Sequence, residues 1–127
     1  MDENKNKDKI IIIDFGSQVT KLIARRIREF GVLSEIITLG ELKYIKNFNR
    51  IKGIILSGGP ATVTNRNFPN IPKSLFLRKI PILGICYGIQ LIAINFGGKV
   101  KKGKKKKRIW KNSFIQKKRI SFNNKIL

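Results

Sequence analysis

The stretch that decides the fold is "IPILGICYGIQLIAINFGG", residues 80–98. It divides into a short apolar run, a turn at Cys86 and a longer apolar run that closes on two glycines. The first run is bounded by breaker residues and has strand length, whereas the second has the length of a short helix. The stretch therefore predicts a buried strand over 80–85 and a helix over 87–96.

The same stretch is long enough to be tested as a membrane span. It is interrupted by Pro81, Gly84, Gly88, Gln90 and Asn95. These residues favour the division into strand, turn and helix, so we expect no membrane segment. The hydrophilic start "MDENKNKDK" does not resemble a secretory signal, and a single cysteine fits a reducing compartment. The expected location is the cytoplasm.

Apolar, β-branched runs recur along the chain before this stretch. They predict further strands over 9–14, 32–39 and 51–57. Residues 41–50 are expected to form a short helix or a loop, and 61–79 a loop with at most one helical segment. Strands that alternate with helical segments predict an α/β fold, a parallel sheet with helices on both faces.

The segment between the first two predicted strands has the pattern of an amphipathic helix. Ser17 is the expected N-cap and Gly31 the expected C-terminal stop. The residues that recur at helical spacing are Val19, Leu22, Ile23, Arg26, Ile27 and Phe30.

Charge is distributed unevenly along the 127 residues, whose formal net charge is +21. No acidic residue follows Glu41, while 13 of the 28 basic residues lie from Lys99 onward. Such a block attracts phosphate backbones non-specifically. Two interpretations stay open, a solvated disordered tail or a nucleic-acid-binding module. The tail's sparse aromatics, Trp110, Phe114 and Phe122, offer poor stacking platforms and favour the first.

These patterns predict three parts of the chain. Residues 1–8 form a flexible N-terminus, 9–103 the folded part, and 104–127 a basic low-complexity tail that is expected to be disordered.

The turn at Cys86 has the form G-x-C-x-G, the thiol counterpart of a nucleophile elbow. Gly84 and Gly88 would let strand and helix approach each other closely, and a helix N-terminus stabilises a thiolate. The Tyr87 N–H would point to a developing oxyanion. Alone, the pattern also fits a buried structural cysteine. The exposed backbone of Gly58-Gly59, at the end of another predicted strand, makes the pair of motifs more specific.

Three blocks carry a family resemblance: "IIDFGSQVTKLIARRIREFGVLSEI", "GIILSGGPATV" and "PILGICYGIQLIA" followed by "NFGGKV". They resemble the amino-terminal part of the class I glutamine amidotransferase domain of GMP synthases, over about residues 9–100. The resemblance implies a Cys-His-Glu triad in which Cys86 attacks the amide of glutamine and releases ammonia. It implies Gly59 and Tyr87 as backbone oxyanion donors, and Gly58 and Gln90 in the glutamine pocket.

In that family, ammonia passes to an ATP-pyrophosphatase (synthetase) domain, which converts XMP to GMP in purine biosynthesis with ATP and Mg²⁺. We expect these 127 residues to lack that domain and to bind no cofactor and no metal. The triad His and Glu are absent as well, because the chain contains no histidine and no acid after Glu41. We therefore expect an inactive fragment with an exposed apolar sheet edge; the alternative is a half-enzyme completed by a partner chain.

The residues Arg108-Ile109-Trp110-Lys111 predict a reading-frame slip in the lysine run before them. The family commonly reads Arg-Glu-Phe-Gly after "GGKV". A Trp codon followed by a Lys codon gives glycine when read one base later, and A/T-rich codons for the two preceding residues give Glu-Phe. Reading the nucleotide sequence one base later from about Lys104 should restore the family's histidine and glutamate. A shifted frame without them contradicts the slip.

Overall fold

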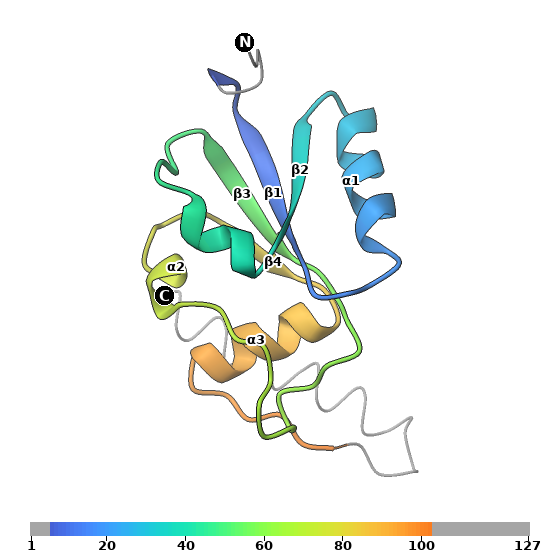
Figure 1. Ribbon diagram of the computed structural model, residues 1–127, viewed down its shortest axis with the longest axis vertical. Coiled ribbons are helices and arrows are strands. Elements are labelled where there is room, and N and C mark those ends of the chain that lie inside the picture. Colours follow the sequence, from blue (N-terminus) through green and yellow to red (C-terminus); the bar gives the residue numbers. More distant parts are fainter. Residues whose placement is uncertain (1–5, 103–127) are drawn as a thin grey trace.

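The computed structural model describes residues 6–102 and shows a four-stranded parallel sheet in the order β2-β1-β3-β4 (Figure 1). The strands are β1 (Lys9–Asp14), β2 (Leu33–Thr38), β3 (Ile51–Leu56) and β4 (Ile82–Gly84). All three strand pairs are parallel, so every strand ends at the same edge of the sheet. The predicted α/β class is confirmed. The expected disorder of 104–127 and part of the expected flexible N-terminus lie outside the described residues.

Within the described residues, three helical segments lie between strands and a fourth follows β4. They are α1 (Thr20–Glu29), the 3-10 helix η2 (Gly40–Tyr44), α2 (Lys73–Phe76) and α3 (Tyr87–Asn95). For 41–50, where the sequence predicts a short helix or a loop, the structure shows a 3-10 helix that starts one residue earlier, at Gly40, and ends at Tyr44. The helical segment allowed within 61–79 is α2. The last strand is shorter than predicted, because only Ile82–Gly84 pair with β3.

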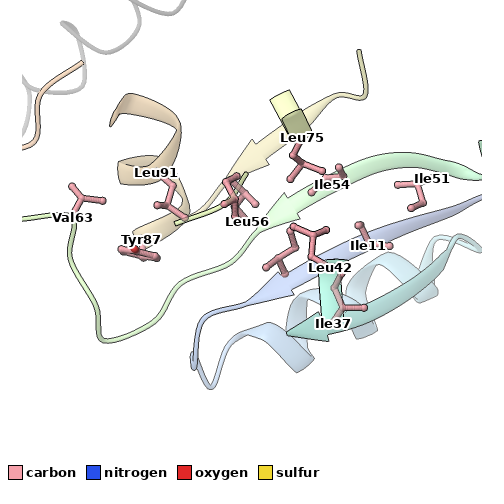
Figure 2. Packing of buried hydrophobic residues seen from close by; sticks show 12 residues of the cluster. Ile11, Ile37, Leu42, Ile51, Ile54, Leu56, Val63, Leu75, Tyr87 and Leu91 are labelled. Atoms are coloured by element: carbon pink, nitrogen blue, oxygen red, sulfur yellow. The ribbon is translucent and has the colours of Figure 1, made fainter. Parts of the chain in front are cut away.

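The core lies on both faces of the sheet, as predicted for helices on both sides. The larger cluster joins the sheet to η2, α2 and α3 (Figure 2). Its buried members come from β1, β2, β3, the three helices and the loop before α2: Ile11, Ile13, Ile37, Leu42, Ile51, Ile54, Leu56, Val63, Ile71, Leu75, Tyr87 and Leu91. The smaller cluster packs Ile12 and Ile55 against Ala24 of α1.

The face that α1 turns to the sheet is only partly the predicted one: Ile23 and Ile27 of the predicted stripe pack against the smaller cluster, as their spacing predicts. Its buried residues are Thr20 and Ala24, whereas Leu22 is 51% exposed and Phe30 84% exposed. The helix therefore packs on the sheet through Ala24 and these two isoleucines rather than through the whole predicted stripe. Apolar spacing alone does not carry this information.

The N-terminus of α1 differs from the predicted one, and its C-terminus ends as predicted. Ser17 is not the N-cap; the helix begins at Thr20, and the Ser17 hydroxyl accepts the Val19 N–H at 3.1 Å. The C-terminal stop is confirmed. Gly31, at φ +79°, donates its N–H to the Arg28 carbonyl, and Val32 donates to Ile27. This is a Schellman ending, which requires a left-handed residue after the helix.

The strand β4 forms one edge of the described sheet, and the expected exposed apolar edge is present there. The Leu83 side chain is 58% exposed on this strand. Within residues 6–102, no helix has the length and apolar character needed to cross a bilayer.

Gly88→Ala should destabilise the fold although alanine is the better helix former. A methyl group at Gly88, in the first turn of α3, would lie 2.0 Å from the Leu56 carbonyl oxygen. Gly→Ala in a helix normally stabilises by about 1 kcal/mol, but overpacking against backbone costs about 1–3 kcal/mol or more. We expect a net loss of about 2 kcal/mol in urea unfolding.

Gly40→Ala is the matched control, because the nearest atom to the added methyl is Thr38 Oγ1 at 3.9 Å. Its stability should change by no more than about 0.5 kcal/mol. A Gly88→Ala variant as stable as the unchanged chain would show that α3 and β3 are not in close backbone contact.

Candidate active site

Three loops meet at the carboxyl edge of the sheet, where ligands bind in open α/β folds. They follow β1, β3 and β4. The Ser57 N–H donates to the Ile13 carbonyl at 3.0 Å, and the Ile85 N–H donates to the Leu56 carbonyl at 2.9 Å. These bonds continue the strand pairing to the last residue before each loop, so the loops begin at fixed positions.

Cys86 lies between β4 and α3 in a backbone conformation that non-glycine residues rarely adopt. Its φ is +53° and its ψ is −114°, and its side chain is exposed. Such a conformation costs about 1–3 kcal/mol and persists only where neighbours impose it. The turn is held by hydrogen bonds from the Gly88 N–H to the Ile85 carbonyl at 2.9 Å and from the Ile89 N–H to the Cys86 carbonyl at 3.0 Å.

The glycines on either side of Cys86 allow an approach that no other residue permits. A methyl group at Gly84 would lie 2.7 Å from the Gly88 carbonyl, and one at Gly88 would lie 2.0 Å from the Leu56 carbonyl oxygen. The first turn of α3 therefore rests directly on the ends of β3 and β4. This contact places the Cys86 side chain on the outside of a sharp turn.

The Gly58-Gly59 turn lies beside Cys86. A methyl group at Gly58 would lie 3.1 Å from Cys86 Cβ and 3.7 Å from Ser17 Oγ. A methyl group at Gly59 would lie 2.0 Å from the Phe15 carbonyl oxygen, so the turn is pressed against the loop that follows β1. The structure thus brings together the two glycine motifs that the sequence placed on separate strands.

The two halves of Tyr87 have different surroundings. The Tyr87 ring is buried and packs edge-on against the Phe15 ring, with ring centroids 5.0 Å apart. The Tyr87 hydroxyl donates a hydrogen bond to the Pro69 carbonyl. Burial raises the pKa of the Tyr87 hydroxyl above its ordinary value of 10.0. Its backbone N–H opens α3 and therefore has no carbonyl acceptor within the helix. The side chain anchors the elbow, and only the N–H can face a reacting group.

Gln90, one turn beyond Cys86, directs its amide oxygen at the loop after β3. Gln90 Oε1 accepts the Thr62 hydroxyl at 3.0 Å and the Val63 N–H at 3.1 Å. Its amide oxygen thus ties α3 to that loop.

The sequence did not reveal a polar network beside this site, in which Asp14 is half-buried and Thr20 and Ser57 are buried. Asp14 Oδ1 accepts the Gly16 N–H at 2.9 Å, the Ser17 N–H at 3.2 Å and the Thr20 hydroxyl at 2.9 Å. Thr20 Oγ1 also lies 2.8 Å from Ser57 Oγ. The only signal in the sequence is a threonine on the inward face of an amphipathic helix.

The arrangement can present a thiol beside backbone N–H groups, which is the geometry of acyl transfer through a thioester. It supplies no imidazole, because the chain contains no histidine. Among residues 6–102, no three His, Cys, Asp or Glu side chains lie together in a way that could hold a metal ion.

Comparison with known proteins identifies the family. The family model "Glutamine amidotransferase class-I" matches residues 11–126. The chain belongs to the class-I glutamine amidotransferase family.

Within the family, the chain is similar to GMP synthases. It is 53% identical over 94 residues to the glutamine-hydrolyzing GMP synthase of Paraburkholderia phytofirmans, covering 73% of this chain and 18% of that protein. It is 52% identical over 101 residues to that of Borreliella burgdorferi strain N40, covering 79% and 20%. The chain thus spans about a fifth of the length of these relatives.

A solved structure supports the fold. A Thermoplasma acidophilum protein proposed to be one of the subunits of a GMP synthase matches with a TM-score of 0.58 and 33% identity. The match covers 78% of this chain and 50% of that one.

In the Asp14→Asn variant, the free energy of unfolding should fall less steeply as the pH is lowered than it does in the unchanged chain. Burial raises the pKa of the Asp14 carboxyl, but the hydrogen bonds from Gly16, Thr20 and Ser17 and the charge of Lys21 outweigh it, so that pKa lies below its ordinary value of 3.8. The ionised carboxyl therefore stabilises the fold fully above about pH 4, and this contribution is lost as the pH falls through the folded-state pKa.

The measurement is the urea midpoint of both chains between about pH 5 and pH 2. Asp8→Asn, which removes a carboxylate paired with Arg50 at the surface, controls for the loss of one negative charge. An Asp14→Asn variant that loses stability as steeply as the unchanged chain would contradict the assignment.

Proposed function

We propose that this chain carries the nucleophile and the oxyanion-binding part of a glutamine-hydrolysing site. The observation that carries the proposal is the strained Cys86 on the elbow between β4 and α3, with Gly58 against it. Membership of the class-I glutamine amidotransferase family supplies the substrate class. The site would bind the side-chain amide of glutamine at the carboxyl edge of the sheet.

The proposed chemistry runs through a thioester. The Cys86 thiolate attacks the side-chain amide carbon of glutamine, and the electron pair of the C=O bond moves to the oxygen. The backbone N–H groups of Gly59 and Tyr87 donate to this oxyanion. The tetrahedral intermediate then expels the nitrogen as ammonia, which requires a proton, and water hydrolyses the thioester to glutamate.

Proton transfer in these steps needs a group that the 127 residues do not provide. A general base must activate the thiol, and the same group as an acid must protonate the leaving nitrogen. The chain contains no histidine, and no acidic residue follows Glu41. We therefore propose that the base comes from a polypeptide segment outside this sequence, and that the chain alone does not turn over glutamine.

The similarity to GMP synthases extends the proposal to the fate of the ammonia. It would be passed in the cytoplasm to a synthetase domain that aminates XMP in purine biosynthesis, using ATP and Mg²⁺. The Thermoplasma acidophilum relative is described as one subunit of its enzyme, which supports a synthetase carried on a separate polypeptide.

The chloromethyl ketone analogue of glutamine tests the nucleophile directly. It should alkylate the chain once, at Cys86, and saturating L-glutamine should slow this reaction at least threefold, whereas D-glutamine should leave it unchanged. Mass spectrometry of the intact and digested protein gives the rate and the position.

Cys86→Ser is the control and should not be alkylated. Chloroacetamide, which lacks the amino-acid part of glutamine, should also alkylate Cys86 but more slowly, and bound L-glutamine should shield the thiol from it as well. The absence of slowing by L-glutamine, or equal slowing by L- and D-glutamine, would contradict a glutamine site at Cys86. The unmodified chain should release no Cys86-dependent ammonia from glutamine.

A further inference from the structure

We propose that Asp14, Thr20 and Ser57 are positioning residues, whose side chains form a hydrogen-bond network from the half-buried Asp14 to the buried Ser57 that fixes the Gly58-Gly59 turn where it can bind the oxyanion. The inference rests on the proposed function of that turn. The chain of hydrogen bonds joins the end of β1, the first residue of α1 and the end of β3.

The direction of each hydrogen bond follows from the groups involved. An ionised carboxylate can only accept, so the Thr20 hydroxyl donates its single proton to Asp14 Oδ1, at 2.9 Å. Thr20 Oγ1 must then accept from the Ser57 hydroxyl, at 2.8 Å. The Thr20 proton is therefore donated to Asp14 and the Ser57 proton to Thr20, so the hydrogen bonds of this network can point in only one direction.

Burial makes that arrangement costly to break. Thr20 is 1% exposed and Ser57 is 0% exposed, so water does not reach either hydroxyl. Within residues 6–102, every buried side-chain nitrogen and oxygen has a hydrogen-bond partner. Removing the central hydroxyl leaves the Ser57 hydroxyl without its acceptor in a site closed to solvent.

The Ser57 anchor controls the next two residues. Its N–H is bonded to the Ile13 carbonyl at 3.0 Å, and its hydroxyl is bonded to Thr20, so β1 and α1 hold it from two directions. Gly58 and Gly59 have no side chains that could fix their position through hydrogen bonds or packing. Their position beside Cys86 therefore depends on the residue before them.

The same carboxylate holds the opposite wall of the turn. Asp14 Oδ1 accepts the N–H groups of Gly16 and Ser17, which fixes the loop after β1. The Phe15 carbonyl of that loop occupies the space where a side chain at Gly59 would lie. One carboxylate thus sets both the anchor of the turn and the surface against which it rests.

Thr20→Val tests the inference, because it replaces the hydroxyl by a methyl group of similar size. The rate of Cys86 alkylation by the chloromethyl ketone of glutamine, which develops an oxyanion, should fall at least tenfold. Alkylation by chloroacetamide should change less than twofold. Thr20→Ser, which keeps the hydroxyl, should restore most of the glutamine-directed rate. A purely structural contribution would change both reagents alike and would overturn the inference.

Amide hydrogen exchange measured by NMR gives a second readout that does not depend on glutamine binding. In Thr20→Val, the Ser57 N–H should exchange at least tenfold faster. The Ile54 N–H, bonded to the Pro81 carbonyl at 3.0 Å, should change less than threefold. Unchanged exchange at Ser57 overturns the inference. If the chain without substitutions shows no L-glutamine protection at Cys86, the proposed function is overturned instead, while the exchange result still decides the positioning.

Ser57→Ala provides a second variant in case Thr20→Val does not fold. It removes only the last donor and leaves the Thr20–Asp14 bond in place. The rate of Cys86 alkylation by the chloromethyl ketone of glutamine should fall at least threefold, and the rate of alkylation by chloroacetamide should stay the same. Equal rates in this variant and the unchanged chain would contradict the role of the Ser57 hydroxyl.

Discussion

The contact between the first turn of α3 and the end of β3 is the constraint on which the rest of the site depends. Gly88 lies so close to the Leu56 carbonyl oxygen that a methyl group there would be 2.0 Å from it. With helix and strand this near, the chain can pass from β4 into α3 only through a sharp turn. Cys86 occupies that turn at φ +53°, and its thiol faces outward because the interior is filled by backbone.

A second set of close contacts builds the surface that the thiol faces. Gly59 is pressed against the Phe15 carbonyl, and Gly58 lies against Cys86. Asp14 fixes the loop after β1 by accepting hydrogen bonds from the Gly16 and Ser17 N–H groups and from the Thr20 hydroxyl. The position of Cys86 is thus determined by van der Waals contact between backbones. The position of its proposed oxyanion site is determined by the hydrogen bonds that join Asp14, Thr20 and Ser57. Both depend on parallel strands that end at one edge.

Much of this architecture could be predicted from the sequence because the signals are local. Apolar β-branched runs bounded by Gly and Pro identify buried parallel strands, and glycines on either side of Cys86 indicate a tight strand-to-helix turn. The inward face of α1 could be predicted only in part: Ile23 and Ile27 lie on it, but Val19 and Leu22 match the helical period equally well and are exposed. The Thr20–Ser57 bond joins residues 37 positions apart, and only the packing of α1 on the sheet brings them together.

The central claim is that Cys86 attacks a glutamine-like carbonyl whose oxygen is received by the backbone of Gly59 and Tyr87. The crystal structure of the chain alkylated by the chloromethyl ketone of glutamine tests it most directly. The account predicts the former ketone oxygen at about 2.7–3.1 Å from both backbone nitrogens. An adduct whose oxygen faces solvent, away from both N–H groups, would contradict it.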